Sequence, residues 1–362
     1  MSKAAELAKM GEVLTNSQIG GRRNIIINGA MQVAQRGTSV SSVTTATHIV
    51  DRFVCQISAL GTWTLSQSTE VPTGEGFTNS FKFDCTTANA SPAAGAFLSC
   101  KQKIEAQNLQ QLKYGTSSAE TVTISFYVRS NKTGTYIFEL IQPDASNRHR
   151  GASYTINSAN TWEKKVITFT GDTSGVINND TSDGMQLTWW LGAGSNFTSG
   201  TLQTDWGALD QTTRAVGNVN LADSTDNEWY ITGVQMEVGS QATPFEHRSF
   251  GEELALCQRY YIDSRAGKPS ELRVIGEAIY SGRIGASVFF PTSMRAAPSV
   301  TIYSPVNETA GKIALYNDQS VDIGSGFAAV VQTQGGITYV SSGSGTSTGS
   351  HYSFKYSADA EF

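Results

Sequence analysis

Long apolar runs, surplus positive charge and paired cysteines are all scarce in this 362-residue chain. No apolar run approaches the roughly 20 residues that span a bilayer. The start, MSKAAELAKMGEVL, lacks the continuous apolar region of a secretory signal. We therefore expect a soluble chain, assembled in a cytoplasm, without membrane insertion. Lys and Arg number 26 against 31 Asp and Glu, so no nucleic-acid partner is expected, because few cations remain to neutralise phosphates.

Only four cysteines occur: Cys55, Cys85, Cys100 and Cys257. They lie far apart, and no CxxC or Cys/His pair has metal-ligand spacing, so we expect no metal and no cofactor. The segments 178–184 (NNDTSDG) and 223–228 (DSTDNE) carry oxygen ligands for a hard cation, but a solvated turn is favoured for both. Four buried thiols are expected, although Cys85 and Cys100 flank one loop and could pair in an oxidising setting.

What is abundant is Gly, Ser, Thr and Asn, a composition typical of short strands joined by turns. In TVTISFYVR, from residue 121, apolar residues alternate with polar ones, which indicates a strand with one buried face. Residues 135–141 follow a turn and predict a hairpin with it. Strands are also expected at 162–171, 185–192 and 228–238, and at the start of 24–37 (NIIINGAMQVAQRG) before the Asn28-Gly29 turn. So many strands favour a sandwich.

The fold expected is all-β. We divide it into an N-terminal attachment arm (1–22), a large β-sandwich body (23–248), a linking helix (249–262) and a small C-terminal β-sandwich tip (263–362). In the arm, a short helix would place Leu7, Met10 and Leu14 on one face for docking; a frayed terminus is the alternative. The segment 341–350 (SSGSGTSTGS) is expected to be a flexible loop.

The segment 238–261 (VGSQATPFEHRSFGEELALCQRYY) holds Glu, His, Arg and Cys together and raises the question of catalysis. Ser249 to Glu252 reads as a capping box, which starts a helix. Its apolar stripe is expected to be Phe250, Leu254, Cys257 and Tyr261, with Gln258 and Arg259 facing water or a partner. Burial would raise the pKa of a cysteine in that stripe, so we interpret the segment as a joint between domains and not as a Cys/His dyad.

Residues 233–261 resemble a segment shared by bacteriophage tail and tail-fibre proteins, notably of marine and cyanobacterial viruses. Residues 24–37 with Asp51-Arg52-Phe53, and the closing 356–361 (YSADAE), resemble the same proteins, although Trp is expected where Phe53 stands. The body also resembles carbohydrate-binding jelly rolls of the galactose-binding-like class, in TVTISFYVRS, GTYIFELIQP and NTWEKKVITFTG. There Trp162 matches a tryptophan that often precedes the penultimate strands.

These resemblances imply a homotrimeric virion protein, a short tail fibre or tail-tip component. It would dock on other tail proteins through its N-terminal arm and bind a host surface glycan or lipopolysaccharide without catalysis, with avidity across copies. A purely structural component (fibre base, capsid decoration or tail cap) is the alternative. A third hypothesis is that the chain is a depolymerase. It would need two carboxylates across a cleft, and the candidates Asp172, Asp180, Asp183, Asp205 and Asp210 all lie in turns that favour Asp for local reasons.

Sugar binding needs aromatic faces beside planar polar side chains. Trp189 and Trp190 are neighbours on a predicted strand, so one should enter the core while the other faces out. For any single tryptophan, a core or subunit-interface position is the alternative. The expected ligand-binding residues are Trp63, Tyr154, Trp189, Trp190, Trp206, Tyr280, Tyr303, Tyr316 and Tyr352, with Tyr339 as a further aromatic of the tip.

Overall fold

The computed structural model describes residue 3 and residues 22–265, 267–268, 271–317, 321–329, 332–341 and 345–362. The expected docking residues Leu7, Met10 and Leu14 lie outside this part of the chain. Within it, no helix is both long and apolar enough to cross a membrane. Unit 1 holds the described residues up to Gln32 and Thr38–Arg248, and unit 2 holds Val33–Gly37 and Ser249–Phe362. Residues 33–37, placed in the body from sequence, thus belong to unit 2, as does the expected linking helix.

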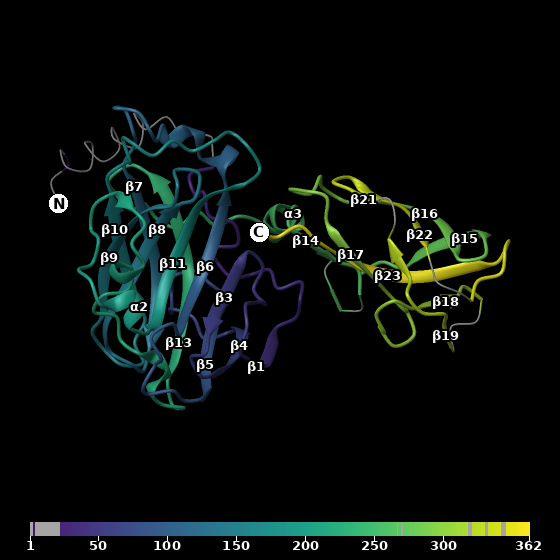
Figure 1. Cartoon of the computed structure of the whole chain (residues 1–362), viewed down its shortest axis with the longest axis horizontal. Helices are drawn as coiled ribbons and strands as arrows, with labels where there is room; N and C mark the ends of the chain where they lie inside the picture. Colours follow the sequence, from purple (N-terminus) through teal and green to yellow (C-terminus); the bar gives the residue numbers. More distant parts are fainter. Residues whose placement is uncertain are drawn as a thin grey trace. The chain divides into compact units, whose positions relative to one another are not determined.

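Unit 1 is an antiparallel two-sheet jelly-roll sandwich (Figure 1). Sheet A runs in the order β1 (Ser39–Val43), β4 (Thr62–Ser68), β5 (Ser80–Thr87), β13 (Glu228–Val238), β7 (Val122–Ser130) and β10 (Glu163–Phe169). Sheet B runs β12 (Gly207–Ala208), β9 (Arg148–Ile156), β8 (Gly134–Gln142), β11 (Asp183–Ala193), β6 (Phe97–Glu105), β3 (Phe53–Ser58) and β2 (Thr47–His48). Short helices lie between strands: η1 (Ala106–Leu112), α2 (Ser195–Thr198), η2 (Gln211–Thr213) and η3 (Leu221–Asp223). The all-β expectation is confirmed.

The hairpin expected between 122–130 and 135–141 is wrong. β7 pairs with β10 and β13 in sheet A, whereas β8 pairs with β9 and β11 in sheet B. The connection crosses from one sheet to the other after Asn131, whose side chain accepts from Glu228 N and donates to Asp226 O at the start of β13. Strands that follow one another can then face each other across the core, so Phe126 of β7 lies 6.2 Å from Phe138 of β8.

The segment 24–37 is not a strand at its start, although its β-branched run predicts one. Asn28 and Met31 adopt positive φ values of 60° and 57°, which breaks regular pairing. The backbone instead bonds along β13 at two points, from Ile25 N to Met236 O and from Val234 N to Gly29 O. A Cβ on Gly29 would lie 2.1 Å from Val234 O, so this close approach requires glycine.

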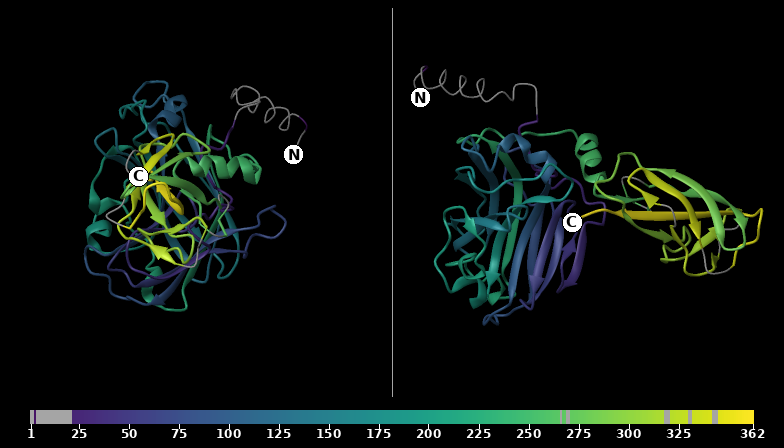
Figure 2. Two further views of the ribbon diagram at one scale, coloured as in Figure 1. Left: turned by 90° about the vertical axis from the view of Figure 1, so that its right-hand side faces the viewer. Right: turned by 45° about the horizontal axis from the view of Figure 1, so that its top comes forward.

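The main part of unit 2 consists of α3 (Phe250–Gln258) followed by one antiparallel sheet (Figure 2). Its strands are β14 (Tyr261–Asp263), β15 (Val274–Tyr280), β16 (Arg283–Phe289), β17 (Ser299–Tyr303), β18 (Ile313–Leu315), β19 (Asp322–Ile323), β20 (Ala328–Ala329), β21 (Gln332–Thr333), β22 (Gly336–Ser341) and β23 (His351–Asp359). The long β23 pairs with β15, β17, β18 and β14. Its pairing with β15 joins the two ends of the strand order β15-β16-β22-β20-β17-β23, so these strands form a closed ring. The core of the unit lies between these strands and includes Ile302 and Phe354.

The helix after Pro244 begins as the sequence predicts, since the Ser249 side chain accepts from Glu252 N. Its buried face differs from the prediction. Glu253, Cys257 and Gln258 are buried, whereas Phe250 is 50% exposed. The helix ends at Gln258 and Tyr261 opens β14, so an apolar stripe continued on helical spacing to Tyr261 does not form.

All four cysteines are buried free thiols, as expected. Cys85 lies on β5 of sheet A and Cys100 on β6 of sheet B, so the two do not form the disulfide considered from sequence. The cross-strand neighbour of Cys100 is Cys55 of β3. The four thiols therefore act as small apolar side chains of the cores.

Candidate functional site

The structure buries most of the aromatic residues that sequence patterns mark for ligand binding. Trp63, Tyr154, Trp189, Trp190 and Tyr352 are all at most 6% exposed and offer no face to a ligand. The expectation that one tryptophan of the 189–190 pair faces out is therefore wrong. Trp189 enters the sandwich core, and Trp190, on the outer face of sheet B, is covered by Phe97 and Phe197. Strand alternation places a side chain on a face but does not say what covers that face.

Trp206, Tyr280, Tyr303 and Tyr316 keep exposed surface. Trp206 precedes β12, where its indole packs edge-on against Tyr114 at 5.8 Å and its Nε1 donates to Thr170 O. Tyr280 ends β15 and stacks with Arg283, whose guanidinium also lies over Tyr339. These four residues lie in separate places, so the structure does not gather the predicted aromatics into one site.

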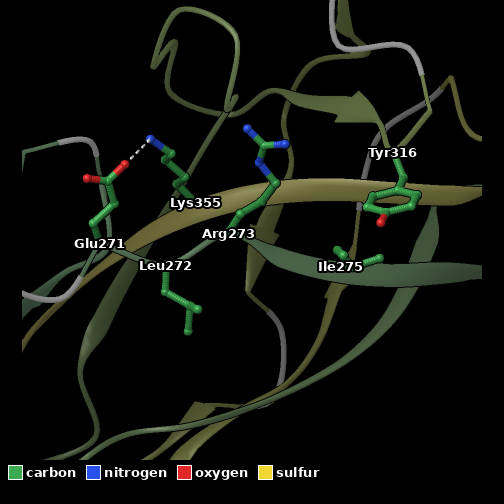
Figure 3. Close-up of a pocket in the computed structure, with 6 residues that line it drawn as sticks. All are labelled: Glu271, Leu272, Arg273, Ile275, Tyr316 and Lys355. Carbon is green, nitrogen blue, oxygen red and sulfur yellow. Dashed lines mark ion pairs between the residues drawn. The ribbon is translucent and has the colours of Figure 1, made fainter.

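Tyr316 lines a pocket of about 560 Å³ in unit 2 together with Glu271, Leu272, Arg273, Ile275 and Lys355. The Tyr316 ring lies beside Ile275, and Lys355 extends toward Glu271 at 3.9 Å (Figure 3). Leu272, Ile275 and Tyr316 are each about half exposed, between 44% and 56%. The lining combines these three half-exposed side chains with three charged ones, Glu271, Arg273 and Lys355.

The aspartates considered for hydrolysis have structural partners. Asp172 is buried and accepts from Arg148 Nε at 2.6 Å. Asp210 caps η2 through Thr212 N, and Asp180 accepts from Ser182 N. Asp183 accepts from Gln186 and lies 3.8 Å from Lys103 Nζ. The fifth, Asp205, has a 96% exposed side chain. Among the described residues, no group of three or more His, Cys, Asp or Glu side chains could hold a metal ion.

A denser cluster lies on the outer face of sheet A, where β5, β13 and β7 are adjacent. Tyr230 of β13 is the direct cross-strand partner of both Lys82 and Arg129, and Glu228 is the partner of Asp84. Directly paired residues point to the same side of a sheet. Their alternates, such as Trp229 and Phe83, fill the core. We call this cluster, with Glu70, Asn160 and Trp162 from the flanking loops, the Tyr230 face.

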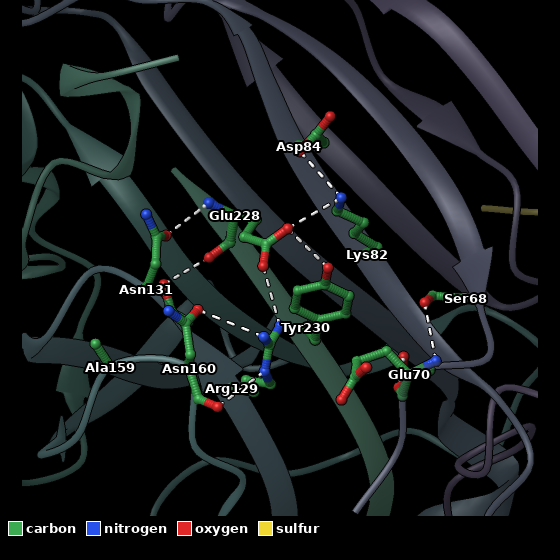
Figure 4. Close-up of polar contacts among 12 residues, drawn as sticks. Ser68, Glu70, Lys82, Asp84, Arg129, Asn131, Ala159, Asn160, Glu228 and Tyr230 are labelled. Atoms are coloured by element: carbon green, nitrogen blue, oxygen red, sulfur yellow. Dashed lines mark hydrogen bonds and ion pairs between the residues drawn. The ribbon is translucent and has the colours of Figure 1, made fainter. Parts of the chain in front are cut away.

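Tyr230 is the centre of this face (Figure 4). Its hydroxyl donates to Glu228 Oε2 at 2.7 Å, and its ring has Arg129 at 4.9 Å and Lys82 at 5.5 Å from its centroid. Glu228 also forms ion pairs of 3.0 Å with Lys82 and with Arg129, and Lys82 reaches Asp84 at 3.1 Å. These contacts fix every member of the cluster in place before any ligand arrives.

The same contacts set the charge of Glu228. Burial raises the pKa of this carboxyl group, but hydrogen bonds from Tyr230 and Lys82 outweigh burial and hold the pKa below its usual value. Conversely, burial and the hydrogen bond to Glu228 raise the pKa of Tyr230. Glu228 is therefore ionised and Tyr230 neutral at neutral pH, and two cations surround one partly buried carboxylate.

Trp162 supplies the partly exposed aromatic surface of the Tyr230 face. It comes immediately before β10, and its ring meets that of Tyr230 edge-on at 6.1 Å. Its Nε1 donates to Glu70 Oε1 at 3.4 Å. Asn160, in the same loop, accepts from Arg129 Nε through its backbone oxygen at 3.2 Å. Trp162 is thus oriented by Tyr230 and Glu70, while Asn160 fixes the arginine beside it.

Sequence patterns missed this face, although Trp162 carries part of the jelly-roll resemblance. In EWYITGVQMEV, Tyr230 occupies a polar-face position between the core residues Trp229 and Ile231. An aromatic residue on the polar face of a strand was the available signal. The partners of Tyr230 come from strands that are far away in the chain. Their proximity follows only from the pairing of β13 with β5 and β7 in the structure.

Comparison with known proteins gives structural neighbours only, since no family model and no curated protein matches the chain. Bacteriophage CBA120 tailspike protein 4, in its enzymatically active domain, is similar with a TM-score of 0.31 and 12% identity, over 60% of this chain and 21% of that one. This chain therefore spans about a fifth of that tailspike domain.

Two further neighbours are a putative sugar binding protein from Bacteroides thetaiotaomicron and a family 16 carbohydrate-binding module. The first has a TM-score of 0.33 and 13% identity over 60% of this chain and all of its own length. The second has a TM-score of 0.25 and 14% identity over 48% of this chain and 84% of its own. Likeness of this degree carries no argument about function, which rests on the residues of the Tyr230 face.

Proposed function

We propose that unit 1 binds carbohydrate on the Tyr230 face by non-catalytic contacts. The observation that carries the proposal is the partly exposed indole of Trp162, held edge-on against Tyr230. Sugar rings present C–H groups that pack on aromatic faces and hydroxyls that bond planar polar side chains. Glu70 and Asn160 supply such groups beside Trp162. Because the ion network already holds the side chains, little conformational entropy is lost when a ligand binds.

The charge of the face favours a neutral sugar. Both cations at its centre are paired with carboxylates, Lys82 with Glu228 and Asp84, and Arg129 with Glu228. An acidic sugar would have to compete with these carboxylates for the same cations. A neutral sugar can instead use the remaining lone pairs and N–H groups without separating an ion pair.

We further propose that the chain is a bacteriophage virion protein of the short tail-fibre or tail-tip type. Three segments, 24–37, 233–261 and 356–361, support this through their resemblance to such proteins. In this role the chain would be assembled in the host cytoplasm and would act as a homotrimer. Its N-terminal arm would attach to other tail proteins, and each copy would contact a host surface glycan or lipopolysaccharide. Weak single contacts would gain strength from their number.

A glycan panel tests the binding site. The full chain and the variant Trp162→Ala are titrated with neutral and acidic oligosaccharides, with Trp206→Ala as the matched control because Trp206 is another partly exposed tryptophan of unit 1. We expect Trp162→Ala to bind at least about fivefold more weakly than the full chain, since stacking contributes about 1 kcal/mol or more. Trp206→Ala should bind normally. Equal loss in both variants would place the site elsewhere.

The same experiment separates the alternative roles. A purely structural virion component would bind no oligosaccharide on the panel in either form. A depolymerase would release new reducing ends from polysaccharide, which the proposal predicts will not happen. Each of these outcomes contradicts non-catalytic glycan binding.

A further inference from the structure

Three neighbouring strands of unit 2, β14, β23 and β17, present a polar face. The register pairs Tyr261 with Asp359 and Asp359 with Ser299. Directly opposed residues point to the same side of a sheet, and so do residues two positions apart. The rows on this side are Tyr261, Asp359 and Ser299, then Asp263, Ser357 and Thr301, then Lys355 and Tyr303. The alternates, such as Ile262, Ile302 and Ala358, enter the core.

A pocket of about 550 Å³ lies on this face. Its lining residues are Arg36, Tyr261, Ser299, Thr301, Tyr303, Ser357, Asp359 and Glu361. The volume falls within the range of roughly 300–1,000 Å³ that holds small ligands. All of the lining residues belong to unit 2, so the pocket is a feature of that unit by itself.

Two arginine–tyrosine stacks hold the ends of the pocket. Arg36 lies 3.5 Å from the ring centroid of Tyr261 and pairs with Asp359 at 3.0 Å. Arg265 lies 4.4 Å from the ring centroid of Tyr303 and binds Asp263 through two nitrogens. Each arginine therefore has its charge balanced by a carboxylate, and each tyrosine ring is fixed in orientation.

Between the two stacks, the floor is lined with hydroxyl groups. Among the described residues, the side chains of Ser299 and Thr301 have no hydrogen-bond partner. Ser357 shares a hydrogen bond of 3.3 Å with the Tyr303 hydroxyl, and the Asp359 side chain is 45% exposed. The pocket thus offers fixed aromatic edges, available hydroxyls and one accessible carboxylate, with no surplus cation.

We propose that this pocket binds a neutral saccharide, as a second carbohydrate site that does not depend on the Tyr230 face. Ser299 and Thr301 would bond sugar hydroxyls, Asp359 would accept from a further hydroxyl, and the Tyr303 ring would pack against the sugar ring. An acidic sugar is disfavoured because Asp359 and Glu361 line the same pocket. With one site in each unit, a single chain binds a glycan surface at two points.

The test uses the full chain carrying Trp162→Ala, so that binding at the Tyr230 face does not contribute to the signal. Neutral trisaccharides of glucose, galactose, mannose and N-acetylglucosamine, with trigalacturonate as the acidic probe, are titrated by calorimetry. Ser299→Ala with Thr301→Val is then added. Ser287→Ala is the matched control, because Ser287 is exposed on β16 outside the pocket. Loss of two hydrogen bonds should weaken binding of the neutral probe at least about tenfold, and the control should leave it unchanged.

Backbone amide shifts keep the test decisive if the double variant unfolds. A neutral trisaccharide that binds in the pocket of the Trp162→Ala chain must shift the amide signals of Ser299, Thr301 and Asp359. The proposal is overturned if no neutral probe binds the Trp162→Ala chain, if only trigalacturonate binds, or if binding leaves these signals in place. If only the proposal for the Tyr230 face is wrong, the result differs: Trp162→Ala does not reduce binding of the oligosaccharide compared with the unsubstituted chain.

Discussion

The guanidinium of Arg36 lies 3.5 Å above the ring of Tyr261, although the two residues come from segments far apart in the chain. Gln35 beside it donates to Tyr261 O at 2.6 Å, and Arg36 forms an ion pair with Asp359. Ala360 N in turn donates to Tyr260 O. Three short stretches that are far apart in the chain, 35–36, 260–261 and 359–360, therefore meet at one place in unit 2. The packing of unit 2 therefore depends on residues from all three stretches.

Replacing Arg36 by Ala should destabilise unit 2 and leave unit 1 unchanged. The Arg36 side chain is only 14% exposed, so its stack on Tyr261 and its ion pair together contribute about 1–2 kcal/mol. All six tryptophans lie in unit 1. Urea unfolding followed by tryptophan fluorescence should therefore be unchanged, whereas a transition followed by backbone circular dichroism should shift. A shift in the tryptophan signal, or no shift in either, contradicts this assignment.

Glu139 should be the most sensitive acid of unit 1. It is fully buried and accepts from His149 Nδ1 at 2.8 Å, Arg214 Nη2 at 2.9 Å and Trp190 Nε1 at 3.0 Å. Glu139→Gln should lower the free energy of unfolding by about 3 kcal/mol, because it leaves Arg214 without its carboxylate. Glu120→Gln, at an exposed ion pair with Lys113, should change it by less than about 0.5 kcal/mol.

The Glu139 effect should also depend on pH. Burial raises the pKa of this carboxyl group, but His149 and Arg214 outweigh burial and hold the pKa below its ordinary value of 4.5. A lowered carboxyl pKa stabilises the folded state above the ordinary value, and this contribution is lost as the pH falls through the folded-state pKa. The difference between wild type and Glu139→Gln should thus be full at pH 7 and smaller near pH 3. A constant difference would be contrary to this explanation.

Replacing Lys101 should change the free energy of unfolding in the opposite direction to Glu139→Gln. Burial, and then the charge of Arg214, lower its pKa from 10.5 to about 8. Between these values the unfolded chain binds more protons than the folded one, so stability rises with pH across this window. Lys101→Met should raise the free energy of unfolding by about 1–2 kcal/mol at pH 7, after allowing for the lost bond to Gln186. The gain should disappear near pH 10.5. Lys113→Met is the exposed control and should have little effect at either pH.

Strand positions and the all-β class were predictable because side-chain alternation is local. The Val122–Val128 strand and the helix start at Ser249, whose side chain caps the helix, both follow from neighbouring residues, and both are confirmed. Sheet partnership is not local. The sequence around residue 131 indicates a turn, but it does not show that β7 pairs with β10 and β13 while β8 pairs with β9 and β11 in the other sheet. The burial of Trp190 could not be predicted for the same reason, because the residues that cover it come from separate segments of the chain.

The thiols should be inert in the native protein. Burial raises the pKa of Cys85 to about 11 and raises those of Cys55 and Cys100 further, so thiolate is scarce at neutral pH. We expect no reaction with a disulfide reagent at pH 8 over the time in which a denatured sample reacts completely. Four thiols should be titrated after denaturation. A native thiol that reacts at the denatured rate would show that one of these sites opens.

The most direct measurement is adsorption of the virus to host cells in the presence of the purified chain. If the Tyr230 face recognises a host glycan, the full chain should slow adsorption at saturating concentration, and Trp206→Ala should do so equally. Trp162→Ala should compete much less well, because the Tyr230 face has lost its aromatic surface. If the full chain does not compete, or if Trp162→Ala competes as well as wild type, host-glycan recognition by the Tyr230 face is contradicted.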